Sequence, residues 1–141
     1  MLKFFSISSL RDSINSYLKY DSYRNCKLDL CDFFKDQTID VIFNNPILLA
    51  PSKTFRFIKS RIQNSNYNKG KSGGYRLYYC VDISSQNVYL LGYFPKTGKF
   101  GREDLTNTEE KIMINKFSSE RTSNTLVLHN IYGDFNEITV G

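Results

Sequence analysis

Two neighbouring apolar runs, Tyr75 to Ile83 and Val88 to Phe94, constrain the fold of this chain more than any other feature. Both are rich in tyrosine, valine, leucine and isoleucine, which favour strands. The polar residues between them, Ser84 to Asn87, form a natural turn, so the two runs are expected to pair as an antiparallel hairpin. Upstream, Phe55 and Phe57 alternate with basic side chains, a pattern typical of a half-buried strand. The middle of the chain is therefore predicted to be an antiparallel sheet.

The first 43 residues are predicted to be mostly helical after a short initial strand. Leu2 to Ile7 suits a strand, and Ser8 can cap a helix whose apolar residues recur at helical spacing. A second helix is expected over about Asp21 to Phe34. A third apolar stretch, Ile39 to Phe43, ends before Pro46, which disfavours helix at the residue preceding it.

The last third of the chain is predicted to contain one helix and one strand. Thr106 and Glu109 have the spacing of a capping box, which indicates a helix that continues to Phe117. Leu126 to Tyr132 suits a further strand, and Gly133 to Gly141 is expected to be a tail. The predicted class is therefore α+β.

Length and composition favour one soluble domain over residues 1–141. Arg11 and Asp12 interrupt the apolar N-terminus well before it reaches the length of a signal-peptide core, and no apolar run is long enough to span a bilayer. A cytoplasmic protein without membrane contact is expected. Cys26, Cys31 and Cys80 lack the C-x-x-C spacing of zinc and redox sites, so we expect reduced, structural thiols, no metal and no cofactor.

The positive charge of the chain is concentrated in its middle. The net charge is +5. Residues 53–102 contain ten lysines and arginines but one acidic residue, Asp82, whereas residues 1–52 are balanced and residues 103–141 are acidic. A basic block that folds into one surface attracts polyanions, which indicates nucleic acid as a partner.

Six short segments follow one another along the chain: Asn45-Pro46, Ile58 to Arg61, Lys71 to Tyr79, Val88 to Tyr93, Lys96, and Asp104-Leu105-Thr106 with Glu109. In this order they resemble the motifs of the RelE/HigB toxins of bacterial type II toxin–antitoxin systems, within the RelE/ParE superfamily. The match covers about Asn44 to Phe117, which leaves an N-terminal helical part, 1–43, and a C-terminal extension, 118–141.

The resemblance implies both a fold and an activity. The fold would have N-terminal helices packed on a strongly curved antiparallel sheet of three to five strands, with a short helix after the last main strand. The activity would be that of a metal-independent endoribonuclease, an mRNA interferase that cuts messenger RNA, commonly on the ribosome, and so inhibits translation. A cognate antitoxin would be the protein partner, and no small-molecule cofactor is implied.

By motif position, the resemblance makes Lys59, Arg61 and Arg76 the expected catalytic residues. Cleavage by the 2′-hydroxyl of RNA needs a base, an acid for the departing 5′-oxygen and cations for the charged phosphorane. Repulsion within a cationic cluster favours an uncharged amine, so Lys59 is the expected base, while an arginine suits phosphate. Further contacts to RNA are expected from Arg56, Lys69, Lys71, Tyr75, Tyr93, Lys96, Lys99 and Arg102.

The general acid stays open at this point, because the single histidine, His129, lies after the last helix of the family match. Two other functions also stay open. A ParE-type toxin shares the fold but poisons DNA gyrase and needs no phosphate cluster, and a non-catalytic RNA- or protein-binding module could keep the fold without the chemistry.

Overall fold

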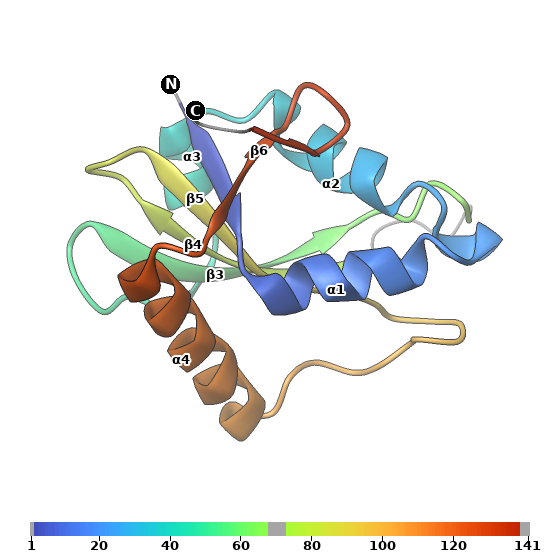
Figure 1. Ribbon diagram of the computed structural model, residues 1–141. Helices are drawn as coiled ribbons and strands as arrows, with labels where there is room; N and C mark the ends of the chain where they lie inside the picture. The colour runs from blue at the N-terminus through green and yellow to red at the C-terminus, as the bar shows by residue number, and fades with distance from the viewer. Residues whose placement is uncertain (1, 68–72, 139–141) are drawn as a thin grey trace.

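The predicted hairpin forms the centre of one seven-stranded sheet with the order β2-β3-β4-β5-β1-β6-β7. A computed structural model describes residues 2–67 and 73–138 (Figure 1). Its elements are β1 (Lys3–Ser6), α1 (Ser8–Tyr17), the 3-10 turn η1 (Asp21–Tyr23), α2 (Cys26–Lys35), α3 (Ile39–Phe43), β2 (Ile47–Leu49), β3 (Phe55–Ile62), β4 (Tyr75–Asp82), β5 (Asn87–Pro95), α4 (Asn107–Ser123), β6 (Val127–Asn130) and β7 (Asn136–Glu137).

Strand β4 lies in the middle of the antiparallel β3-β4-β5 unit, and all eight of its residues are buried. The turn that follows is closed by Asp82, whose carboxylate accepts hydrogen bonds from the Ser84 backbone and from the hydroxyls of Ser84 and Ser85. Gln86 then adopts a φ of 58°, in the left-handed region that tight turns use. The antiparallel hairpin predicted from the sequence is thus confirmed.

Helices cover both faces of the sheet. Phe34 of α2 packs on Tyr79, with ring centroids 5.3 Å apart, whereas Phe117 of α4 packs on Tyr89 at 4.8 Å. Tyr79 and the partner of Tyr89, Cys80, are consecutive on β4 and therefore point to opposite faces. Figure 1 shows α2 and α4 on opposite sides of the strands.

The predicted initial strand is present, and it makes the sheet mixed rather than purely antiparallel. β1 lies between β5 and β6 and runs parallel to β5, with Lys3 opposite Asn87 and Ser6 opposite Leu90. Parallel pairing needs a long connection, and the helices and the β2-β3-β4 strands provide it. A sheet of three to five antiparallel strands was therefore an incomplete prediction: seven strands form a mostly antiparallel sheet.

The helices differ from the predictions mainly in their ends. The expected helix from Asp21 to Phe34 is divided into η1 and α2. The helix after the last main strand is not short, because α4 has 17 residues. Its capping box is confirmed: Thr106 Oγ1 accepts from the Glu109 N–H, and the Glu109 carboxylate accepts from the Thr106 N–H.

The C-terminal segment 133–138 is part of the fold rather than a tail, and the last three residues of the expected tail, 139–141, lie outside the described residues. Phe135 is buried and its ring stacks on His129 with centroids 3.8 Å apart. Asn136 and Glu137 then pair with β6. No helix within residues 2–67 and 73–138 combines the length and the apolar character that crossing a membrane requires.

Candidate phosphate-binding site

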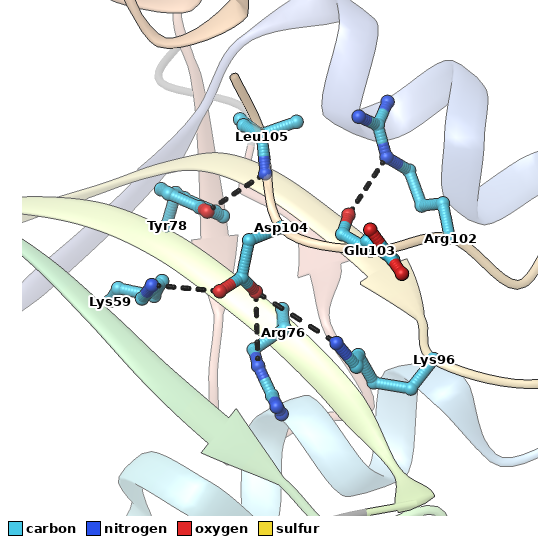
Figure 2. Close-up of polar contacts among 8 residues, drawn as sticks. All are labelled: Lys59, Arg76, Tyr78, Lys96, Arg102, Glu103, Asp104 and Leu105. Atoms are coloured by element: carbon cyan, nitrogen blue, oxygen red, sulfur yellow. Dashed lines mark hydrogen bonds and ion pairs between the residues drawn. The ribbon is translucent and has the colours of Figure 1, made fainter. Parts of the chain in front are cut away.

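The register of β3 and β4 places three predicted site residues on one face of the sheet. Lys59 pairs with Tyr78, and Arg61 pairs with Arg76. Alternate residues of a strand share a face, so Lys59, Arg61 and Arg76 all point to the α4 side. Lys96, which directly follows β5, reaches the same region (Figure 2).

One carboxylate lies at the point where three of these cations meet. Asp104 Oδ2 lies 3.0 Å from Lys59 Nζ, and Asp104 Oδ1 lies 3.3 Å from Arg76 Nε and 4.0 Å from Lys96 Nζ. We call Lys59, Arg76 and Lys96 the basic cluster. The hydrogen bond from Lys59 lowers the pKa of Asp104 below its ordinary value, so the carboxylate is charged at neutral pH.

The side chains of the basic cluster differ in exposure: Arg76 forms its buried floor, and Lys59 lies at its solvent-exposed edge. The Arg76 side chain is 8% exposed, that of Lys96 22% and that of Lys59 35%, whereas that of Asp104 is 46% exposed. The buried Nη1 atom of Arg76 has no hydrogen-bond partner in the part of the chain that the structure describes. A buried, unsatisfied guanidinium nitrogen is costly, so the contact of Arg76 Nε with Asp104 is an important compensation for this side chain.

Tyr78 holds the backbone beside Asp104. Its hydroxyl oxygen accepts a hydrogen bond from the Leu105 N–H at 3.1 Å (Figure 2). Burial raises the pKa of Tyr78, so its phenol stays neutral. The predicted site residues included neither Asp104 nor Tyr78, although both belong to the motifs that carry the family resemblance; the position of Asp104 two residues before a helix cap is the one sequence signal that marks it.

Arg61 is exposed on the face of the basic cluster and forms no ion pair within the described ranges. It is therefore free to contact an adjacent phosphate of a bound chain. Lys69 and Lys71, for which RNA contacts were expected, lie outside the described residues.

Three other expected RNA contacts are engaged within the protein. Arg56 points to the opposite face, where it donates to the Phe43 carbonyl at 2.6 Å and lies 3.8 Å over the Phe43 ring. Lys99 donates to the Tyr20 hydroxyl, and Arg102 donates to the Glu109 carboxylate at 2.7 Å. These three cations do not join the basic cluster.

The RNA contacts expected from Tyr75 and Tyr93 do not agree with the structure, because neither side chain is accessible. Both rings are buried between the sheet and the N-terminal helices, with their centroids 4.6 Å apart. The Tyr93 hydroxyl donates to the Cys26 carbonyl. Tyrosines spaced along a strand can lie either in the core or on the surface. Here both tyrosines point to the α2 side of the sheet, which the N-terminal helices cover.

His129 lies away from the basic cluster, on β6, which β5 and β1 separate from β4. Its Nε2 lies 2.6 Å from Ser6 Oγ and its Nδ1 lies 3.0 Å from the Phe135 carbonyl. The ring thus joins β1, β6 and the C-terminal segment, which is a structural role.

The three cysteines are buried and form no disulfide. Burial raises the pKa of Cys26 and Cys80 to about 12 and that of Cys31 to about 11, so all three are neutral thiols. Within residues 2–67 and 73–138, no group of three histidine, cysteine or carboxylate side chains is arranged to hold a metal ion.

Chemically, the basic cluster can hold an oxyanion, as it holds the Asp104 carboxylate. Two ammonium groups and a guanidinium converge on the oxygens of a single anionic group, and this is the arrangement by which proteins bind phosphate and stabilise charge on it. Comparisons with models of protein families, with curated proteins and with solved structures found no match for this chain. The function proposed below therefore depends on this geometry and on the sequence motifs.

Proposed function

We propose that this protein is the cytoplasmic toxin of a toxin–antitoxin pair and that it acts as a metal-independent endoribonuclease on messenger RNA, with the ribosome as its place of action. The single observation that carries the proposal is the convergence of Lys59, Arg76 and Lys96 on one anion position. A scissile phosphate placed there would meet all three cations. The excess positive charge of residues 53–102 would draw the RNA to this face.

The arrangement of the two lysines suits in-line cleavage by the 2′-hydroxyl. Lys59 and Lys96 approach the anion position from opposite sides (Figure 2). In such a displacement the attacking 2′-oxygen and the departing 5′-oxygen also lie on opposite sides of phosphorus. In its neutral amine form Lys59 would take the proton of the 2′-hydroxyl, and Lys96 in its ammonium form would protonate the 5′-oxygen. The products would be a 2′,3′-cyclic phosphate and a 5′-hydroxyl.

Arg76 would stabilise the phosphorane between the two lysines. Its guanidinium is buried, arginine carries its charge in proteins, and Arg76 Nε faces the anion position. Donors fixed in a partly dry site are worth more in the transition state than donors in water, because no reorganisation is needed. Arg61 would hold a neighbouring phosphate and set the register of the chain.

A non-catalytic binding module of the same fold is the second candidate. One observation favours it: the single histidine is held in the β1-β6 region, so no imidazole of the described chain reaches the basic cluster. Such a module would bind RNA or a protein with the same cations but would leave RNA intact.

The test combines induction in a bacterial host with an assay of the purified protein. Growth and new RNA 5′ ends would be measured for the unmodified chain, for Arg76→Gln and for Arg24→Gln. The last is a matched control, because Arg24 is an exposed arginine in a pair with Asp21. The purified protein would also be tested on RNA in the presence of EDTA.

The expected result is growth arrest and 5′-hydroxyl ends within translated messages for the unmodified chain and Arg24→Gln, but not for Arg76→Gln, with cleavage that persists in EDTA. RNA binding without cleavage would contradict the proposed nuclease and favour the non-catalytic binding module. Growth arrest with DNA damage and intact RNA would instead indicate a ParE-type gyrase poison.

A further inference from the structure

The carboxylate of Asp104 occupies the basic cluster in the way that a phosphate would. Its two oxygens are divided between the cations: Oδ2 faces Lys59, and Oδ1 faces both Arg76 and Lys96. The two non-bridging oxygens of a phosphodiester would face the same groups. A phosphate cannot share this position with the carboxylate, because the two anions would repel each other at contact distance.

The loop that carries Asp104 does not need this carboxylate for its own placement. On one side, Arg102 donates to Glu109 and its backbone N–H donates to the Pro95 carbonyl. On the other side, the Leu105 N–H donates to Tyr78, and the helix that follows has its own capping box. The contacts of the Asp104 carboxylate with the basic cluster are thus separable from the fold of the loop.

The carboxylate also fills the site incompletely. Asp104 contacts Arg76 at Nε alone, while the buried Nη1 of Arg76 lacks an acceptor among the described residues. One carboxylate oxygen therefore satisfies only part of the Arg76 guanidinium, which has five N–H donors. The Asp104 side chain is nearly half exposed, so rotation toward solvent can remove it from the cluster.

We propose that Asp104 is a resident competitor that keeps the anion site closed, and that an RNA phosphate enters by displacing the Asp104 carboxylate toward solvent. This inference rests on the proposed function in that RNA is the ligand. It adds that the free protein is held in a self-inhibited state by its own chain. Removal of the charge at residue 104 should therefore open the site.

A rival interpretation predicts the opposite sign. If Asp104 served to orient Lys59 for catalysis or to contact the RNA, loss of its charge would weaken binding or slow cleavage. Glu103 offers a matched control, because it is the adjacent acidic residue, it is exposed, and its carboxylate forms no contact with the basic cluster (Figure 2). Any long-range effect of one less negative charge should be similar at both positions.

The experiment measures binding of a fluorescent 2′-O-methyl RNA oligonucleotide, which cannot be cleaved by its own 2′-hydroxyl. Asp104→Asn and Glu103→Gln would be compared with the unmodified chain by fluorescence anisotropy. We expect Asp104→Asn to bind about tenfold more tightly, which corresponds to about 1.4 kcal/mol, and Glu103→Gln to change affinity by less than about twofold. Asp104→Ser serves as the second variant, should the asparagine variant fail to fold.

A parallel titration with inorganic phosphate, followed by NMR of the arginine side-chain Nε–H signals, separates this inference from the proposed function. Stronger phosphate binding by Asp104→Asn, with an Arg76 shift, supports the competitor role even if no variant cuts RNA. Equal gains in affinity for Asp104→Asn and Glu103→Gln overturn the competitor role, because the gain would then come from the change in net charge alone. Weaker binding by Asp104→Asn overturns it in favour of a positioning or ligand-contact role.

Discussion

Arg76, at the buried floor of the sheet, and Asp104, in the loop before α4, form an ion pair at 3.3 Å that joins segments 28 positions apart in the sequence. The guanidinium has almost no contact with water, so the carboxylate is its principal compensation. The same pair therefore serves two purposes. It stabilises the free protein, and it closes the site at which a phosphate is proposed to bind.

The first prediction concerns stability. Asp104→Asn should lower the free energy of unfolding by about 1 to 3 kcal/mol, because a buried charge loses its counter-charge. Added phosphate should restore part of this loss, since a ligand of the folded state stabilises it. Urea unfolding with and without phosphate measures both effects. Glu103→Gln should stay within about 0.5 kcal/mol; an equal loss there would contradict the pairing.

The members of the basic cluster should differ in their importance for RNA. Arg76→Gln should weaken binding or cleavage by about 100-fold, since it removes a fixed and buried donor. Lys96→Gln should weaken RNA binding by about tenfold, because its ammonium is more exposed and screened. Its effect on cleavage should be larger, about 100-fold or more, since Lys96 is the proposed general acid. Thermal unfolding of both variants checks that the fold persists. A larger effect on binding at Lys96 than at Arg76 would contradict a guanidinium-centred site.

The buried tyrosine pair gives a matched comparison within the core. Tyr93→Phe should lower the free energy of unfolding by about 1 kcal/mol, because the Cys26 carbonyl loses its donor. Tyr75→Phe should leave it unchanged or raise it, since the buried Tyr75 hydroxyl has no hydrogen-bond partner among the described residues. Neither variant should alter RNA affinity. Weaker RNA binding by either variant, without loss of stability, would contradict the burial of these side chains away from the basic cluster.

Protonation of His129 should make the protein less stable in mild acid. Burial lowers the pKa of His129 in the folded state, so the unfolded chain takes up a proton more readily as the pH falls below the ordinary value of about 6.5. The contribution of neutral His129 to the free energy of unfolding is thus fully present above a pH of about 6.5. It is lost as the pH falls toward the lower pKa that His129 has in the folded protein. Urea unfolding from about pH 7.5 to about pH 5.5 should show this decline. In His129→Gln the decline should be smaller; an unchanged slope would assign it to other groups.

Local patterns in the sequence predicted the elements that carry most of the site. The strand residues of β4 and β5 form two apolar runs, the turn after Asp82 is polar, and the capping box before α4 follows from two side chains three positions apart. Their pairing then places Lys59, Arg61 and Arg76 on one face. Each of these features depends on neighbours in sequence or on one hairpin register, which the residues themselves specify.

Other features followed from contacts between distant segments. Phe135 belongs to one core with residues of the N-terminal helices, such as Ile14, and β1 is a parallel strand because it pairs with β5, with Lys3 opposite Asn87. Asp104 belongs to a motif, but its position over Arg76 depends on how the loop returns across the sheet. Short-range patterns contain no information on such encounters.

By itself the sequence determined the strand hairpin, the helix cap and the concentration of positive charge in residues 53–102, because periodicity, capping and charge are properties of neighbouring residues. Only the tertiary structure decided which cations converge, which are held in other contacts and which tyrosines are buried. Lys59, Arg76 and Lys96 come from three different segments, and their common anion position exists only once β3, β4, β5 and the following loop have packed together.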